Sequence, residues 1–135
     1  MSRKVARESL YKLIFEYLFS KMEDNTALEL MCHDAKLSED DVAYLRRAYS
    51  GVLEGFDGYL ETVKSKSHAF SLERVYKADL AALVLALYEI DKEGDIPPVV
   101  SINEAVELVK RYSTEKSHSF VHGILASVVN NKESK

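Results

Sequence analysis

Apolar residues recur at helical spacing along nearly the whole chain, and alternating strand-like patterns are almost absent. Glycine and proline, which interrupt helices, number only five and two. Apolar positions three and four residues apart are typical of a helix with one face in a core. The pattern predicts an all-α fold, with helices over about 3–22, 26–36, 38–67 (broken near 56), 78–90, 101–112 and 115–130.

Residues 78–90 form the most apolar segment, in which only Asp79 and Glu89 are charged. A helix that is apolar on every side has to be surrounded by other helices. Each buried leucine contributes roughly 1.5–3 kcal/mol, so this segment outweighs any surface feature in setting the fold. We expect it to be the central helix, with Glu89 as a structural hydrogen-bond partner for a helix end.

Polar residues mark the expected helix starts. Thr26-x-x-Glu29 and Ser101-x-x-Glu104 fit the spacing of capping boxes, and Ser38 precedes acidic residues that suit the positive end of a helix dipole. The pair Pro97-Pro98 predicts extended backbone, because proline disfavours the α conformation in the residue before it. Gly123 costs a helix about 1 kcal/mol relative to alanine, which predicts that another group packs closely there.

Length and composition limit the class of protein. The 135 residues suit a single domain over 1–135 that buries roughly two-thirds of its unfolded surface. With 18 basic and 22 acidic residues the net charge is −4, so any contact with nucleic acid must come from a local patch. The only cysteine, Cys32, excludes an internal disulfide. We find no signal-peptide pattern and no apolar run near the ~20 residues that span a bilayer, and we expect a cytoplasmic protein without a membrane segment.

The first helix carries an unusual stripe, with Arg3 and Arg7 in front of apolar residues at the same helical spacing. Four basic residues against one acid in the first twelve give this end a local charge of +3. Because an unpaired buried charge costs several kcal/mol, we expect the start of the helix to project past the body and to display Arg3, Lys4 and Arg7 together. Arginine-rich helices suit RNA phosphates and bases; the competing interpretation is an ordinary solvated helix end.

The other candidate side chains do not indicate a catalytic or metal site. His118 and His122 lie four residues apart, as two metal ligands do, but no third ligand is near in sequence, so surface or capping roles are favoured. Asp79 and Glu89 are ten residues apart on one helix, about 15 Å, which is too far for one reaction centre. Phe120 suits either the core or a base-stacking platform. We expect no enzyme, no cofactor and no metal.

An ordered set of motifs in the last third of the chain carries a resemblance to a known family. The set is a helix that ends Leu87-Tyr88-Glu89-Ile90, the diproline turn, Ile102-Asn103-Glu104-Ala105 and Phe120-Val121-His122-Gly123; Ala6-Arg7-Glu8, Arg47–Val52 and Ser71–Arg74 precede it. This order resembles the NusB family of transcription antitermination factors. The resemblance implies an all-helical bundle of about seven helices in two subdomains. It also implies non-enzymatic action with NusE, a ribosomal protein, on boxA-type ribosomal RNA, within the RNA polymerase antitermination complex.

The resemblance also implies roles for individual residues. The residues implied to bind RNA are Arg3, Lys4, Arg7, Lys116, Phe120 and His122. Those implied to bind the protein partner are Phe15, Glu73, Arg74 and Asp79. The sequence departs from the family where Phe15 replaces a common tyrosine, where His122 replaces an asparagine, and where Leu80 and Val84 occupy positions that are commonly basic. These departures predict weaker RNA binding, because fewer cations meet the phosphates.

Two alternatives follow from the same residues. The acidic total and the missing basic residues favour a protein-binding helical adaptor with little RNA affinity of its own. The same fold also occurs as the accessory domain of an RNA methyltransferase, but the chain has no room for a methyl-donor site. Exposed helix faces can also pair two copies, so a homodimer is a further hypothesis.

Overall fold

The computed structural model describes residues 2–67 and 71–133. This part of the chain contains seven α-helices, one short 3-10 helix and no β-strand, which confirms the predicted all-α fold. The helices are α1 (Ser2–Ser20), α2 (Asn25–Cys32), α3 (Glu39–Glu54), α4 (Phe56–Lys66), α5 (Lys77–Lys92), α6 (Pro98–Tyr112) and α7 (Ser117–Glu133), with the 3-10 helix η1 (Leu72–Arg74) before α5.

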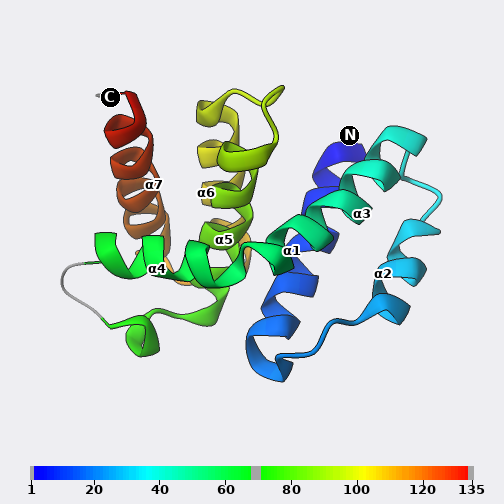
Figure 1. Cartoon of the computed structure of the whole chain (residues 1–135), viewed down its shortest axis with the longest axis horizontal. Coiled ribbons are helices and arrows are strands. Elements are labelled where there is room, and N and C mark those ends of the chain that lie inside the picture. Colours follow the sequence, from blue (N-terminus) through cyan, green and yellow to red (C-terminus); the bar gives the residue numbers. More distant parts are fainter. Residues whose placement is uncertain (1, 68–70, 134–135) are drawn as a thin grey trace.

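The helices form two subdomains (Figure 1). One contains α1, α2 and α3, and the other contains α4, α5, α6 and α7. The central helix α5 contacts α1 and α3 of the first subdomain as well as all three other helices of its own. Every residue of α5 from Asp79 to Glu89 is buried, as predicted for a helix that is apolar on all sides. None of the helices in the described part of the chain is both long and apolar enough to cross a membrane.

The helix starts agree only in part with the sequence analysis. Ser38 caps α3 as predicted, and its side chain accepts a hydrogen bond from the backbone N–H of Asp41 at 3.2 Å. The capping box at Thr26 is wrong, because Asp24 caps α2. The capping box at Ser101 is also wrong: α6 begins at Pro98, where a missing N–H is harmless, and Ser101 lies inside the helix. Pro97 has the expected extended backbone.

The glycines differ in how closely neighbouring helices pack against them. A Cβ atom on Gly51 would overlap the ring of Tyr88 on α5, so only glycine lets α3 approach α5 at this point. The long predicted helix breaks at Gly55, close to the expected position. At Gly123 the expectation was wrong: among the described residues, no atom outside the adjoining turns of α7 lies within 4 Å of the position that a Cβ would occupy.

Candidate nucleic-acid interface

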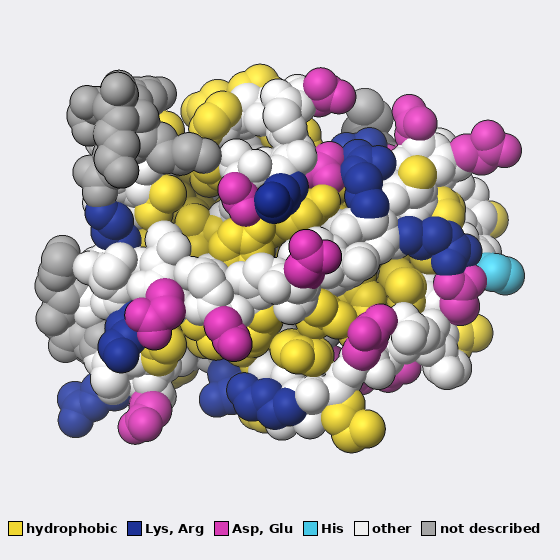
Figure 2. Space-filling view, in the orientation of Figure 1, with side chains coloured by type: hydrophobic (Ala, Val, Ile, Leu, Met, Phe, Trp, Pro, Cys, Tyr) yellow, Lys and Arg dark blue, Asp and Glu magenta, His cyan; other side chains and the backbone are white. Residues whose placement is uncertain are grey.

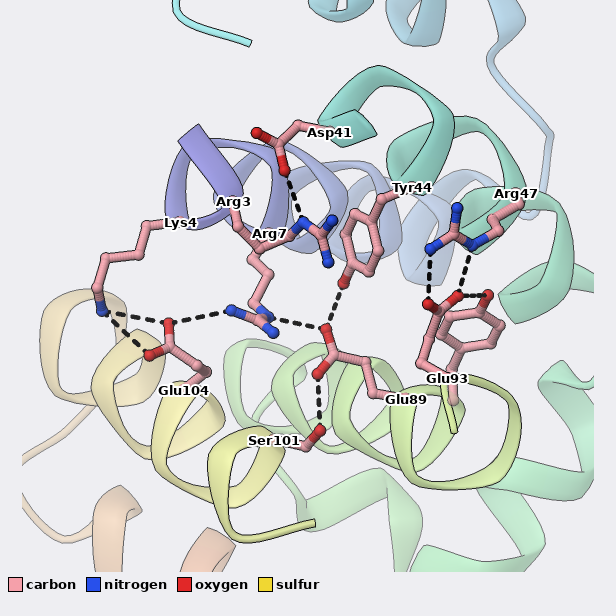
Figure 3. Close-up of polar contacts among 11 residues, drawn as sticks. Arg3, Lys4, Arg7, Asp41, Tyr44, Arg47, Glu89, Glu93, Ser101 and Glu104 are labelled. Atoms are coloured by element: carbon pink, nitrogen blue, oxygen red, sulfur yellow. Dashed lines mark hydrogen bonds and ion pairs between the residues drawn. The ribbon is translucent and has the colours of Figure 1, made fainter. Parts of the chain in front are cut away.

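Arg7 and Glu89 form an ion pair inside the core (Figure 3), with Arg7 Nε 2.8 Å from Glu89 Oε2. The Glu89 side chain is fully buried and that of Arg7 is 8% exposed. The carboxylate also accepts hydrogen bonds from the hydroxyls of Tyr44 and Ser101, the latter at 2.7 Å. One carboxylate on α5 therefore holds side chains from α1, α3 and α6.

The prediction that Arg7 is displayed on the surface is wrong. Burial alone lowers the pKa of Arg7, but the hydrogen bond and charge of Glu89 outweigh burial and raise it. Burial, followed by the negative charge of Glu89, raises the pKa of Tyr44. The buried guanidinium is thus compensated by the carboxylate 2.8 Å away, which is how a core stripe can contain an arginine.

Arg3 is also paired, although it remains partly exposed. Its Nε lies 2.6 Å from Asp41 Oδ1, and its guanidinium lies 4.4 Å from the centre of the Tyr44 ring. Burial by itself raises the pKa of Asp41. The hydrogen bonds from Arg3 and Ser38 lower the pKa by more than burial raises it, so the net shift is downward. About a third of the Arg3 side chain is accessible to a ligand.

Lys4 is the most exposed of the three predicted cations. Its side chain is 59% exposed, and its Nζ lies 3.1 Å from Glu104 Oε2 on α6. The other oxygen of Glu104 lies 3.7 Å from Arg7 Nη1. Carboxylates from α3, α5 and α6 therefore face the three cations. In the folded protein these carboxylates offset the local charge of +3 that the first twelve residues carry.

Ionic side chains continue along the line where α1 passes α6. We call the surface formed by Lys4, Glu8, Lys12, Glu104, Arg111 and Tyr112 the α1/α6 seam. Arg111 pairs with Glu8, and the Tyr112 ring stacks on Tyr11 at 5.5 Å between centroids. The side chains of Lys12 and Arg111 are 54% and 64% exposed. The sequence analysis named neither cation as a candidate RNA contact, although it counted Lys12 in the basic first helix and Arg111 follows Lys110 in the last turn of α6.

Charged groups of both signs also mix over the face of the protein drawn in Figure 2, where no single basic patch dominates. This mixture agrees with a net charge of −4. Any RNA contact therefore depends on individual accessible cations.

A pocket lies at the end of the seam, where α5 begins and α7 starts. Its cavity volume is about 550 Å³, and its wall is formed by Arg74, Val75, Tyr76, Asp79, Thr114, Glu115, Lys116, Ser117 and Phe120. The fold thus brings together two residues implied to bind RNA and two implied to bind the protein partner. Tyr11 links the pocket to the seam, since its hydroxyl donates to the Ala78 carbonyl at 2.9 Å.

Asp79 is buried at this pocket, with only 3% of its surface exposed. The Ser113 hydroxyl donates to Asp79 Oδ1 at 2.6 Å. Burial, with the nearby charge of Asp79, raises the pKa of Tyr11 to about 12. Asp79 therefore presents a recessed carboxylate and no broad surface for a partner.

The remaining implied residues lie elsewhere on the surface. Glu73 is exposed on η1, and His122 is exposed on α7 without lining the pocket. Phe15 is 37% exposed and packs edge-to-face on Phe19, which is 62% exposed. Leu80 and Val84 are buried in α5, so these positions supply no RNA-facing surface in this chain.

The histidines do not assemble a metal site in the described residues. His118 Nδ1 lies 2.9 Å from the Glu115 carbonyl, at the start of α7. No group of three or more potential ligands comes together in the part of the chain that the structure covers. His118 is exposed and contacts the loop before α7, which agrees with the surface role that the sequence analysis gave as one of two.

The fold defines the class of protein: an all-α bundle of two subdomains that share one central helix. A solved structure of T. maritima NusB has this fold, at a TM-score of 0.87 and 33% identity, with 96% of this chain and 92% of that chain covered. A solved structure of the antitermination factors NusB and NusE in complex with dsRNA shares the fold at a TM-score of 0.84 and 18% identity, with 96% of this chain and 97% of that chain covered.

The chain belongs to the NusB family, whose model matches residues 2–130. A relative from Finegoldia magna, the transcription antitermination protein NusB, is 35% identical over 133 residues, which is 98% of this chain and 97% of the relative. The protein of that name from Acetivibrio thermocellus is 39% identical over 129 residues, covering 96% and 89% of the two chains.

Proposed function

We propose that this protein is a cytoplasmic transcription antitermination factor that binds boxA-type single-stranded RNA together with NusE. In this role it supports processive transcription of ribosomal RNA as a non-enzymatic part of the RNA polymerase antitermination complex. The observation that carries the proposal is the α1/α6 seam, a line of accessible cations that leads to an aromatic-lined pocket. The names of the similar proteins support the same role.

The RNA backbone would follow the seam and exchange carboxylate partners for phosphates. Lys4, Lys12 and Arg111 form exposed ion pairs, and such pairs contribute little free energy because water and salt screen them. Replacing a surface carboxylate by a phosphate therefore costs little free energy. Arg7, in contrast, stays paired with Glu89 in the core. In this proposal Arg7 is a positioning residue, and Arg3 and Lys4 make the phosphate contacts at the start of α1.

The protein partner would bind beside the pocket. Phe15, Phe19 and Tyr76 are exposed aromatic side chains, and Lys77 Nζ lies 5.3 Å above the ring of Phe19. Exposed aromatic groups are common in the centres of protein interfaces. Tyr76 also lines the pocket, so NusE and RNA would meet at its edge, next to Glu73 and Arg74 on η1.

The test is a titration of labelled boxA-type RNA at several salt concentrations, with and without NusE. Lys4→Gln is expected to weaken binding and to reduce the log–log salt slope by about 1. Glu104→Gln is expected to strengthen binding, because it releases Lys4 from its carboxylate. Lys64→Gln, an exposed lysine on α4, serves as the matched control. Equal slopes for all four proteins would remove the α1/α6 seam from the RNA site.

A second candidate is a protein-binding adaptor with little RNA affinity. The carboxylates that face Arg3, Lys4 and Arg7 favour it, because they cancel the charge that would attract RNA. Tight NusE binding without detectable RNA binding, alone or with NusE, would establish the adaptor. The homodimer stays a prediction, which sedimentation at several protein concentrations would test.

A further inference from the structure

Two adjoining hollows lie where α4 crosses α5 (Figure 1). Their cavity volumes are about 480 and 240 Å³, and Gly58, Tyr59 and Asp91 line both of them. We call the two hollows together the α4/α5 groove. The groove shares no lining residue with the α1/α6 seam or with the pocket at the starts of α5 and α7. A ligand in this groove would therefore leave the site proposed for RNA unoccupied.

The larger hollow has two carboxylates close to one tyrosine. The Tyr59 hydroxyl donates a hydrogen bond to Asp91 Oδ2 at 2.8 Å. Burial is the largest cause that raises the pKa of Tyr59, and the charges of Asp91 and Glu54 raise it further, so both carboxylates act on the same hydroxyl. Lys92 also lines this hollow. Within the described ranges, however, no cation forms an ion pair with Asp91 or Glu54, and both residues are exposed.

The smaller hollow is largely apolar. Its wall contains Leu87 and Ile90 of α5 and Val128 of α7. Leu87 is buried, whereas Ile90 and Val128 pack against the core with part of their surface exposed. An apolar side chain of a ligand would cover this surface and release water from it. The α4/α5 groove thus joins an acidic end to an apolar end.

Gly58 lies inside α4, and packing within the described chain gives no reason for a glycine there. Glycine weakens a helix relative to alanine. Among the described residues, no atom outside the adjoining turns of α4 lies within 4 Å of the position that a Cβ would occupy. Gly58 is exposed and lines both hollows. A methyl group there would narrow their junction, whereas glycine lets the backbone of a ligand approach the helix closely.

We propose that the α4/α5 groove binds a peptide segment of a protein partner that carries an arginine or lysine near an aliphatic residue. The cation pairs with Asp91 and Glu54, the aliphatic side chain enters the apolar end, and the peptide backbone passes over Gly58. Peptide-binding domains commonly combine side-chain pockets with close approach of the backbone. This surface is additional to the seam proposed for RNA and to the aromatic surface proposed for NusE.

The charges and the apolar end together favour a peptide over other ligands. Carboxylates repel the phosphates of a nucleic acid, because like charges raise the energy of the complex. A polyamine would satisfy the carboxylates, but it has no aliphatic side chain for the hollow at Leu87 and Ile90. An arginine side chain offers several donors to a carboxylate and also packs well on aromatic rings, and the ring of Tyr59 lies in the same wall.

The experiment titrates the isotope-labelled protein with short capped peptides in which an arginine precedes a leucine at several spacings. Nuclear magnetic resonance follows the backbone amide signals of Gly58, Tyr59 and Thr62, which line the groove. At least one spacing is expected to shift these signals. The matched peptide with glutamine in place of the arginine should bind about three- to tenfold more weakly, because it lacks the charge-assisted hydrogen bonds.

Two pairs of variants separate the groove from general effects. Asp91→Asn keeps an acceptor for Tyr59 and should remove most of the preference for arginine, whereas Asp57→Asn, at an exposed position on α4 outside both hollows, should keep it. Gly58→Ala should raise the melting temperature and weaken peptide binding. Gly123→Ala, a second glycine inside a helix with open space around it, should also raise the melting temperature but leave peptide binding unchanged.

Several outcomes would overturn the inference. These are the absence of any shift in the groove signals, equal binding of the arginine and glutamine peptides, and equal effects of Gly58→Ala and Gly123→Ala. Spermidine binding that matches the peptide and responds equally to Asp91→Asn would assign the groove to polyamines instead. Signals that change with protein concentration alone would assign it to a second copy of the chain.

A competition measurement distinguishes this inference from the proposed function. Labelled boxA-type RNA and the arginine peptide are expected to bind at the same time. Displacement of the RNA by the peptide would place the peptide in the RNA site and would overturn the inference alone. Peptide binding in the groove by a protein that binds no RNA, with or without NusE, would support the inference and overturn the proposed function.

Discussion

Arg7 on α1 and Glu89 on α5 are 82 residues apart in sequence, yet their side chains lie 2.8 Å apart inside the core. Glu89 is fully buried and also accepts hydrogen bonds from Tyr44 and Ser101. This ion pair attaches the first helix to the central one. It also keeps α1 next to α6, because Arg7 lies 3.7 Å from Glu104.

Arg7→Ala is expected to destabilise the protein by about 3–5 kcal/mol, because Glu89 is left as a buried charge without its partner. Chemical denaturation measures the loss. The double variant Arg7→Met with Glu89→Gln should recover much of it, since it removes both charges and keeps an acceptor for Tyr44. Arg46→Ala breaks an exposed ion pair with Glu29 and should change stability far less, because water and salt screen such a pair. Equal losses for Arg7→Ala and Arg46→Ala would contradict the structural role of the buried pair.

The ion pair between Glu93 and Arg47 predicts that the folded protein loses stability in acid. Arg47 donates to both oxygens of Glu93 at 2.8 and 2.9 Å, and the hydrogen bond from Arg47 is the largest cause that lowers the pKa of Glu93 from its ordinary value of 4.5. A carboxylate with a lowered folded-state pKa stabilises the fold above the unfolded-state pKa, and this contribution disappears as the pH falls through the folded-state value.

The free energy of unfolding should therefore decrease as the pH falls below about 4.5. In Glu93→Gln this decrease should be smaller over the same range, although the variant starts from a lower stability at pH 7. Glu61→Gln, at an exposed position on α4, should retain the pH dependence of the unaltered protein. Denaturant titrations from pH 3 to 7 make the comparison. An identical pH dependence in Glu93→Gln would show that the pair with Arg47 contributes no stability.

Gly51 and Gly123 should respond to alanine in opposite directions. Gly51→Ala would press its Cβ against the Tyr88 ring, whose Cδ1 lies only 3.1 Å away and whose hydroxyl is held by Glu93 at 2.6 Å. The ring has little room to move, so stability should fall by roughly 1–3 kcal/mol. In Gly123→Ala the new Cβ meets no described residue outside the adjoining turns of α7 within 4 Å, so the variant should gain up to about 1 kcal/mol from helix propensity. Thermal unfolding of the two variants tests this, and a stabilising Gly51→Ala would exclude the close approach of α3 to α5.

The two predictions that failed at the N-terminus and at Gly123 have one cause. Helical spacing showed that Arg3 and Arg7 share a stripe with core residues, and exposure was the simplest way to accommodate their charge. The alternative, a buried carboxylate opposite each arginine, depends on Asp41 and Glu89, which lie 38 and 82 residues further along the chain. Likewise, the space around Gly123 depends on which helix passes it, and no local pattern records that.

The sequence by itself determined the helices, the central place of α5, the cap at Ser38 and the family, because these follow from local spacing and from ordered motifs. The tertiary structure alone decided which cations stay accessible and where the pocket forms. It pairs Lys4 with Glu104 across 100 residues and assembles Asp79, Lys116 and Phe120 from two helices and the turn between α6 and α7. Periodicity is a property of neighbouring residues, whereas the effective charge of a surface depends on groups that only folding brings together.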